Sequence, residues 1–336
     1  MTPIQAQSLP PMPQGKDVIA QAKTGSGKTA AFGLALLALL DAESPRLQSL
    51  VLCPTRELAE QVCKELRALA RFIPNLKILS LCGGVPVGVQ INSLVHEPQV
   101  VVGTPGRLID LLDKNLLKLD ALQSVVLDEA DRMLDMGFLP DIRRIVKALP
   151  RPRQTLLFSA TLSPDIEKIT REFQESPKVV QVGKRSNPAE TVEQCVYEVP
   201  HPGKQNLLLH LLRDPAMQMV LIFTRTKHGA DRVARRLEQS GITTATLHAN
   251  RSQNQRIRAL RDFKAGTVRV LVATDIAARG IDVEGISHVV NFDFPPHPED
   301  YVHRIGRTGR AKAVGDAISF VTSEDRAPLR SLEKFI

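Results

Sequence analysis

Short apolar runs alternate along the first half of the chain with segments whose apolar residues recur at helical spacing. The runs predict strands at residues 17–20, 50–53, 77–81, 100–102, 125–127 and 155–158, and the spaced segments predict helices at residues 30–40, 56–71 and 139–149. Apolar runs without alternation are typical of strands that are buried on both faces of a parallel sheet. Strands that alternate with helices predict a doubly wound α/β domain, in which helices cover both faces of that sheet.

A polar segment at residues 183–188 interrupts this pattern and predicts a linker. The alternation then starts again, with strands predicted at residues 220–223, 244–247, 268–272, 288–290 and 317–321 and helices at residues 227–239 and 253–263. We therefore expect an α/β fold of two tandem doubly wound domains, at residues 1–183 and 191–336, with a short linker at residues 184–190. We expect a cleft between them, in which one domain completes a ligand site held by the other.

The sequence AKTGSGKT, which starts at Ala22, lies between a predicted strand and a predicted helix. This order is typical of a phosphate-binding loop. Gly25 and Gly27 can adopt positive φ and bring backbone N–H groups close to an anion. Lys28 would place a positive charge on the phosphates, and Thr29 would offer its hydroxyl to Mg²⁺. A flexible surface turn is the alternative, and Ala22 stands where the strict pattern has glycine.

Three carboxylates follow the predicted strand at residues 125–127 within four positions: Asp128, Glu129 and Asp131. Carboxylates this close repel one another unless a cation offsets their charge. Mg²⁺ suits such a place because it binds carboxylates and phosphate oxygens and keeps several waters. A solvated acidic turn is the alternative interpretation. The phosphate-binding pattern upstream favours the magnesium site.

Composition narrows the class of protein. The 336 residues are 43% hydrophobic, with no Trp and an aromatic content of 4%, so aliphatic side chains must fill the cores. We find no apolar run long enough to span a membrane and no secretory signal at the N-terminus. The four cysteines show no CxxC spacing and predict reduced thiols in a cytoplasmic protein.

Positive charge is concentrated in the second half. The formal net charge is +8; positions 1–183 hold 21 basic and 19 acidic residues, and the remainder holds 23 basic and 17 acidic residues. Most of the basic residues in the second half are arginines, which make forked contacts with phosphate. This excess predicts a polyanionic partner, although a basic face that serves only solubility is the alternative.

One arginine-rich segment in the second half predicts a catalytic role. Arg304, Arg307 and Arg310 recur every three residues, with Gly306 and Gly309 between them. In a helix this spacing would give one basic face, which the glycines would weaken. Arginines that approach a phosphate closely can stabilise the charge of a phosphoryl group in transfer. A solvated basic turn is the alternative.

Together these residues resemble the DEAD-box family of ATP-dependent RNA helicases, within helicase superfamily 2. The resemblance covers the chain from about Thr2 to Ile336; within the family the first half resembles bacterial DbpA-type members and the second half RhlE-type members. The matching segments, in family order, are TPIQ from Thr2, AKTGSGKT from Ala22, PTRELA from Pro54, Gly83-Gly84, TPGR from Thr104, DEAD from Asp128, SAT from Ser159, Phe223-Thr224, Gln253 with Arg256, ATDIAARGID from Ala273 and HRIGRTGR from His303.

The resemblance implies two RecA-like domains, ATP and Mg²⁺ as cofactors, and a role for each matching residue. ATP would be held by Gln5, which reads the adenine, by Thr24, Gly25, Ser26, Gly27, Lys28 and Thr29, and by Asp282 at the ribose. Thr29 and Asp128 would hold Mg²⁺, Asp128 partly through water, and Glu129 would activate the attacking water. Arg307 and Arg310 would act as arginine fingers. Coupling between the ATP and RNA sites would involve Asp131, Ser159, Thr161, His303 and Arg304.

The resemblance also implies that RNA is the partner of a monomeric core. Its backbone would contact Pro54, Thr55, Arg56, Gly84, Thr104 and Arg107 in the first domain and Gln253, Arg256, Thr274 and Arg279 in the second. Contacts of this kind are independent of sequence. The expected activity is RNA-dependent ATP hydrolysis with local separation of short duplexes, hydrolysis resetting the closed state.

Alternatives remain at this stage. The same residues would serve an ATP-dependent RNA clamp or a superfamily 2 ATPase that moves along DNA. Arg56, Gln253 and Arg256 lie on predicted helices, where a solvated face is the usual explanation. His248 can be read as a satisfied histidine at a strand end, and Thr161 as a helix cap.

Overall fold

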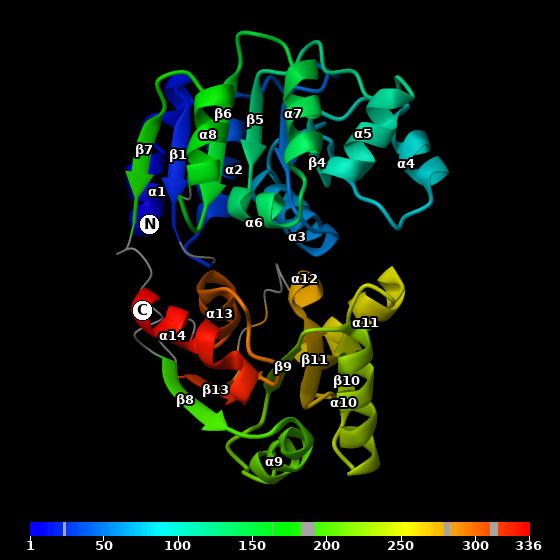
Figure 1. The fold of residues 1–336 in the computed structure, drawn as a ribbon. Helices are drawn as coiled ribbons and strands as arrows, with labels where there is room; N and C mark the ends of the chain where they lie inside the picture. The colour runs from blue at the N-terminus through cyan, green and yellow to red at the C-terminus, as the bar shows by residue number, and fades with distance from the viewer. Residues whose placement is uncertain (23–24, 163, 183–191, 279–282, 284, 310–314) are drawn as a thin grey trace. The chain divides into compact units, whose positions relative to one another are not determined.

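The computed structural model describes residues 1–336 except 23–24, 163, 183–191, 279–282, 284 and 310–314. The chain divides into two compact units, Met1–Gly183 and Lys184–Ile336, called unit 1 and unit 2 below (Figure 1). Each unit is an α/β structure built on one parallel sheet, so the predicted fold class is confirmed. The expected linker at residues 184–190 lies outside the described residues.

Unit 1 has a seven-stranded sheet in the order β3-β4-β2-β5-β6-β1-β7, and every pair of neighbouring strands is parallel. Its strands are β1 (Val18–Gln21), β2 (Ser49–Leu52), β3 (Ile78–Leu81), β4 (Val100–Gly103), β5 (Ser124–Leu127), β6 (Gln154–Ser159) and β7 (Lys178–Gln181). Its helices are α1 (Pro3–Ser8), η1 (Met12–Gln14), α2 (Lys28–Leu39), α3 (Arg56–Leu69), α4 (Val87–Leu94), α5 (Pro105–Asp113), α6 (Ala130–Asp135), α7 (Leu139–Ala148) and α8 (Pro164–Phe173).

Alternation of side chains along the buried strands produces two cores in unit 1. Val51 packs with Phe32 of α2 and Val62 of α3 in a core on one face, whereas its neighbour Leu50 packs with Ile142 of α7 on the opposite face. Figure 1 shows α2 behind the sheet and α7 and α8 in front of it. Both faces are thus covered by helices, as the uninterrupted apolar strands predicted.

Unit 2 has a six-stranded sheet in the order β10-β11-β9-β12-β13-β8, again parallel throughout. Its strands are β8 (Val192–Glu198), β9 (Val220–Thr224), β10 (Thr244–Leu247), β11 (Val270–Thr274), β12 (His288–Asn291) and β13 (Gly315–Val321). Its helices are η2 (His201–Gly203), α9 (Lys204–Leu211), α10 (Lys227–Gln239), α11 (Gln253–Lys264), α12 (Asp275–Ala278), α13 (Pro298–Ile305), η3 (Ser323–Asp325) and α14 (Arg326–Phe335).

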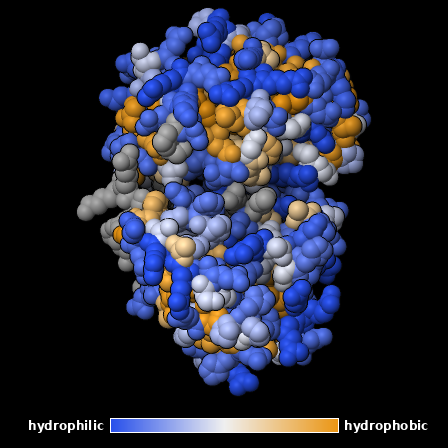
Figure 2. Space-filling model, viewed as in Figure 1, coloured by the Kyte–Doolittle hydropathy of each residue, from blue (hydrophilic) through white to orange (hydrophobic). Residues whose placement is uncertain are grey.

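Helices again cover both faces of this sheet. Ile222 packs with Val233 of α10 on one face, and the adjacent Leu221 packs with Phe263 of α11 on the other. On the face drawn in Figure 2, hydrophilic residues dominate the surface of unit 2, while unit 1 also shows hydrophobic residues between its polar ones. Among the described residues, none of the helices is long and apolar enough to cross a membrane.

The sequence patterns located the central strands and missed β7 and β8. Each missed strand pairs with only one neighbour and therefore lies at the edge of its sheet. Their residues are mostly exposed, so the apolar run that marks a buried strand is absent from them. The helix predicted from residue 30 begins instead at Lys28, because the glycine-rich loop passes directly into the first helical turn.

Candidate active site and RNA-contacting residues

The glycine-rich loop of unit 1 depends on two left-handed glycines. Gly25 has φ +80° and Gly27 has φ +90°, and Gly27 immediately precedes α2. The Gln5 side chain lies against the loop, where Nε2 donates to the Gly27 carbonyl at 3.2 Å. A Cβ on Gly27 would lie 2.6 Å from Gln5 Nε2, so only glycine fits there. Thr24 lies outside the described residues.

Three side chains at the start of α2 have the chemistry of a phosphate site. Lys28 is only 6% exposed, and its Nζ donates to the Ala22 carbonyl at 2.9 Å. The Ser26 hydroxyl is buried without a hydrogen-bond partner among the described residues. A buried polar atom without a partner is uncommon and is consistent with a ligand position. Thr29 is partly exposed on the first turn of α2.

The strand β5 brings the acidic cluster to the same edge of the sheet. Asp128 directly follows β5 and is 3% exposed. Burial raises the pKa of its carboxyl to about 7, against the opposing effect of the Lys28 charge and with a further increase from Glu129. The strand order β5-β6-β1 brings the segment after β5 close to the loop after β1, although Lys28 and Asp128 are a hundred residues apart in sequence.

Glu129 is held in an uncommon backbone conformation. Its φ of +50° is left-handed, and it precedes α6 as the helix cap. The Arg132 guanidinium lies 4.0 Å from its carboxylate, and both side chains are buried. Non-glycine residues in this conformation are infrequent and gather at functional sites.

The residues around Asp128 fit a bound Mg²⁺. A buried carboxylate and the Thr29 hydroxyl are hard oxygen donors, which Mg²⁺ prefers. The high pKa of Asp128 reflects a carboxylate whose burial is not fully offset by the neighbouring lysine. No group of three or more metal-ligating side chains occurs in the part of the chain that the structure describes. Mg²⁺ is usually bound by one or two carboxylates together with water and phosphate oxygens.

Three predicted coupling residues of unit 1 form one hydrogen-bonded network. Asp131 Oδ2 accepts from the backbone N–H groups of Ala160 and Thr161, at 3.1 and 3.0 Å, and from Thr161 Oγ1 at 3.2 Å. Ser159 Oγ accepts from the Asp131 N–H at 3.3 Å and donates to the Thr161 carbonyl at 2.7 Å. Thr161 therefore does more than cap a helix: it links the start of α6 to the end of β6.

The arginine segment of unit 2 does not form one exposed basic face. Arg304 is 3% exposed and forms a forked pair with Asp275, at 2.6 and 2.7 Å. Its Nη1 also donates to Asn291 Oδ1 at 3.0 Å and to the Asp293 carbonyl at 2.7 Å. The Arg304 guanidinium therefore links several segments within unit 2, because its position on α13 directs the side chain into the core. No sequence pattern predicted Asp275 as the partner of Arg304.

The other residues predicted to act in this segment lie only partly within the described part of the chain. Arg307 follows α13 in a turn and is 4% exposed. Thr308 fixes this turn, since its Oγ1 donates to the Ser287 carbonyl at 3.2 Å. His303 lies on α13 and is half-buried. Arg310 and Asp282 lie outside the described residues.

Two of the expected RNA-contacting arginines in unit 1 lie beside the loop that follows β3. Gly84 has φ +82°, and a Cβ there would lie 1.8 Å from Arg56 Nη1. Arg107 Nη2 donates to the Val85 carbonyl at 3.0 Å. The neighbouring Pro54 and Thr55 are buried, and Thr55 Oγ1 caps α3 by accepting from the Leu58 N–H. Thr104 precedes α5 at the equivalent point after β4.

The expected contacts of unit 2 lie at the carboxyl ends of its strands. Gln253 and Arg256 are on the first turns of α11, whose start Ser252 caps. The Gln253 amide has buried atoms without hydrogen-bond partners among the described residues. Thr274 ends β11. Arg279 lies outside the described residues.

Only one ring nitrogen of His248 has a hydrogen-bond partner among the described residues, because Nδ1 is buried without one, so the interpretation as a satisfied histidine holds in part. Its ring is 1% exposed, and Nε2 lies 3.0 Å from Asp231 Oδ1. Arg251 Nη2 contacts the same oxygen at 2.8 Å.

Comparisons with known proteins show which family the chain resembles. The family model DEAD/DEAH box helicase matches residues 2–169, and the helicase conserved C-terminal domain matches residues 203–312. The chain is 50% identical over 325 residues to the ATP-dependent RNA helicase DbpA of Escherichia coli, covering 97% of this chain and 71% of that protein. It is 45% identical over 333 residues to the ATP-dependent RNA helicase CshA of Listeria monocytogenes, covering 99% of this chain and 64% of that protein.

Solved structures show the same fold. Dbp5 of S. cerevisiae bound to RNA and ADP BeF3 matches with a TM-score of 0.91 at 31% identity, over 99% of this chain and 87% of that one. A DEAD box protein from Methanococcus jannaschii matches with a TM-score of 0.56 at 36% identity, over 99% and 90%. The chain spans about two thirds of the length of the curated relatives named above. These matches show that the chain belongs to the DEAD/DEAH box helicase family.

Proposed function

We propose that this protein is an RNA-dependent ATPase that uses ATP to separate short RNA duplexes. One observation carries the proposal: Lys28, Asp128 and the Asp131 network meet at the carboxyl edge of the unit 1 sheet. Ligands of open α/β sheets bind at this edge. The names of DbpA and CshA as ATP-dependent RNA helicases, and the RNA bound to Dbp5, support the same reading for this chain.

Unit 1 binds the ATP in this proposal. The left-handed glycines Gly25 and Gly27 would turn backbone N–H groups toward the phosphates, and the N-terminus of α2 would add its partial positive charge. Lys28 would exchange its hydrogen bond with the Ala22 carbonyl for a phosphate oxygen. Gln5 would read an adenine edge with its amide, and its contact with the Gly27 carbonyl supports this role.

Two residues would hold the Mg²⁺ that accompanies ATP. These are Thr29, through its hydroxyl, and Asp128, partly through water. Bound Mg²⁺ supplies charge neutralisation on the phosphate oxygens. Because burial raises the pKa of Asp128, a nearby cation would help the carboxyl to ionise.

Glu129 acts as the base that orients and deprotonates the attacking water. Its left-handed backbone and its neighbour Arg132 restrict where the carboxylate points. A base must lie within hydrogen-bond reach of the water, so this restriction favours the reaction. Asp131, Ser159 and Thr161, with His303 of unit 2, transmit the state of the nucleotide to the RNA contacts.

Unit 2 contributes arginine fingers, Arg307 and Arg310, to the same ATP, and Asp282 contacts the ribose. The fingers stabilise the charge that develops on the transferred phosphoryl group, an effect worth about a thousandfold or more in rate. Arg304 does not reach the ATP; it holds α13 against Asp275, as its buried forked pair indicates.

RNA binds through its backbone to groups from both units. The contacts in unit 1 are Pro54, Thr55, Arg56, Gly84, Thr104 and Arg107, and those in unit 2 are Gln253, Arg256, Thr274 and Arg279. Small polar groups and arginines suit phosphates and 2′-hydroxyls, which carry no sequence information. Hydrolysis then resets the closed state and releases the strand.

ATPase titrations with single-stranded RNA, duplex RNA and single-stranded DNA test the proposal directly. We expect RNA to raise kcat strongly, DNA to have little effect, and Glu129→Gln to remove turnover while ATP still binds. Equal stimulation by DNA would identify a different superfamily 2 ATPase. Strong RNA-dependent hydrolysis without any strand separation, measured on a short labelled duplex, would identify an RNA clamp instead.

A further inference from the structure

The two units share one winding order, which relates every strand of unit 2 to a strand of unit 1. Read across the sheets, β10, β11, β9, β12, β13 and β8 occupy the places of β3, β4, β2, β5, β6 and β1. The order along the chain is also the same. The connection from β8 to α9 therefore stands where the phosphate-binding loop stands in unit 1, between β1 and α2.

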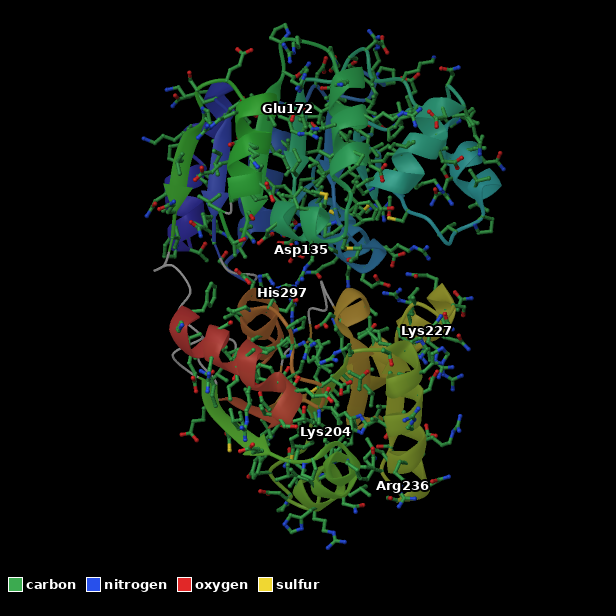
Figure 3. The ribbon with its side chains drawn as sticks, in the orientation of Figure 1. Asp135, Glu172, Lys204, Lys227, Arg236 and His297 are labelled. Carbon is green, nitrogen blue, oxygen red and sulfur yellow. The ribbon has the colours of Figure 1, made fainter. Side chains whose placement is uncertain are left out.

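A glycine and a lysine occupy equivalent positions in these two connections. Gly27 precedes α2 and Lys28 is its first residue; Gly203 precedes α9 and Lys204 is its first residue. Both lysine side chains are buried, Lys204 to 2% exposure. Figure 3 labels Lys204 within the body of unit 2.

The connection in unit 2 nevertheless lacks the features of a phosphate site. Gly203 has φ −82°, whereas Gly27 has φ +90°. Pro200 and Pro202 in this connection have no backbone N–H to donate. A phosphate could not be surrounded by N–H groups here, so the buried lysine needs another partner.

That partner is the segment that follows β12, the counterpart of β5. Lys204 Nζ donates to the Phe292 carbonyl at 2.8 Å and lies 3.7 Å from Asp293 Oδ1. In unit 1 the residue after the equivalent strand is Asp128, and the charge of Lys28 acts to lower the pKa of its carboxyl. The first residue after β12 is Phe292, so Asp293 corresponds in position to Glu129 and not to Asp128. Unit 2 thus also has a lysine beside a carboxylate at this end of its sheet, but the lysine bonds to the protein itself.

The segment Phe292–Asp293 also contacts Arg304, which begins the turn that carries Arg307. Arg304 Nη1 donates to the Asp293 carbonyl at 2.7 Å. The backbone N–H of Arg307 then donates to the Arg304 carbonyl at 3.1 Å, so the turn that carries Arg307 begins on the residue that Asp293 holds. A shift of Phe292 and Asp293 would move Arg304 and, with it, Arg307.

We propose that Lys204 is a positioning residue for Arg307, acting through the Phe292–Asp293 segment and Arg304. It occupies the place of a nucleotide-binding lysine but binds the protein's own carbonyl and carboxylate. The inference rests on the proposed ATPase function, in which Arg307 is a finger.

The test substitutes Lys204→Met, which keeps a long apolar side chain and removes the charge and the donors. We expect kcat of the RNA-stimulated ATPase to fall about a hundredfold, because small displacements of a catalytic group have effects of this size. The KM for ATP and the RNA affinity should stay within about twofold of wild type, because their binding groups are elsewhere. Lys334→Met, at an exposed lysine of α14, is the matched control and should behave as wild type.

A double variant with Arg307→Ala distinguishes a positioning role of Lys204 from a general structural role. In Arg307→Ala, single-turnover hydrolysis should be slow already, and adding Lys204→Met should slow it no further, since the lysine acts only through that arginine. A further fall in the double variant, or wild-type kcat in the single variant, would overturn the assignment.

Thermal unfolding and ATP binding show whether the variant is folded. If Lys204→Met does not fold, the proposal is tested with Asp293→Asn instead. This variant keeps an acceptor for the Arg225 N–H and weakens only the contact with Lys204. Its kcat should fall about tenfold, the scale of one charged contact; an unchanged kcat rejects the proposal. Absence of ATP hydrolysis by the wild type would instead reject the proposed function.

Discussion

At the scale of single residues, Asp128 shows how burial sets the charge of a carboxyl group before a ligand arrives. Its pKa rises from 3.8 to about 7, chiefly through burial. The folded protein then binds this proton more tightly than the unfolded chain does. The contribution of Asp128 to the free energy of unfolding is therefore lost as the pH rises from about 4 to about 7.

We predict that Asp128→Asn removes this pH-dependent loss in the free energy of unfolding, measured on the protein without nucleotide or metal. Urea unfolding across about pH 4 to 8 should show the variant growing more stable relative to wild type as the pH rises, because the neutral amide has no charge to bury. Glu43→Gln, at an exposed carboxylate, should follow the wild-type curve. Parallel curves for Asp128→Asn and wild type would mean that Asp128 is not held protonated.

Gly84 offers a second prediction at this scale. Gly84→Ala would place a Cβ against the Arg56 guanidinium at a φ of +82°. The displaced arginine should weaken RNA binding about tenfold, the scale of one charge-assisted hydrogen bond, without changing the KM for ATP. Gly137→Ala is the matched control, because its φ is +78° but nothing lies within 4 Å of the new Cβ. Equal RNA affinity in both variants would contradict a role for Arg56.

Sequence motifs predicted much of the nucleotide site, but they did not predict which side chains pair with one another inside each unit. Gly25, Gly27 and Lys28 follow a local pattern, since a phosphate loop is made by consecutive residues. The pairing of Arg304 with Asp275 joins residues from two separate elements, and no local pattern records it. Arg304 is buried because α13 directs its side chain into the core, which the spacing of the arginines alone did not indicate.

At the scale of elements, the Asp131 network joins the start of α6 to the end of β6. We predict that Asp131→Ala lowers the free energy of unfolding by several kcal/mol, because each buried N–H left unsatisfied costs about 1–3 kcal/mol. Thr161→Val removes only one of the three donors to Asp131 Oδ2 and should cost less. Chemical denaturation measures both, and a larger loss in Thr161→Val would contradict the network.

The elements themselves were predictable where burial leaves a simple signal. Strands β9 and β12 are fully buried, and apolar runs located them. The edge strands β7 and β8 expose most of their residues, so that signal is absent. Short helices such as α6 and α12 follow directly after strands and were not predicted, because they contain too few residues to show a helical spacing of apolar positions.

At the scale of the whole molecule, the two sheets share one order of winding, as expected for the two RecA-like domains that the resemblance implies. Only the structure aligns Lys28 with Lys204, because the residues around them differ. The shared order explains how one unit supplies a nucleotide loop while its counterpart keeps a similar lysine for an internal contact. Two similar units thus perform different tasks on one ATP in the proposed mechanism.

The central claim is that hydrolysis requires an arginine from unit 2 as well as the loop of unit 1. The most direct test is single-turnover ATP hydrolysis by Arg307→Ala at saturating RNA, together with its affinity for ATP. We predict a rate about a thousandfold or more below wild type with ATP still bound, while Arg236→Ala, at an exposed arginine of α10, keeps the wild-type rate. A wild-type rate in Arg307→Ala would contradict the account.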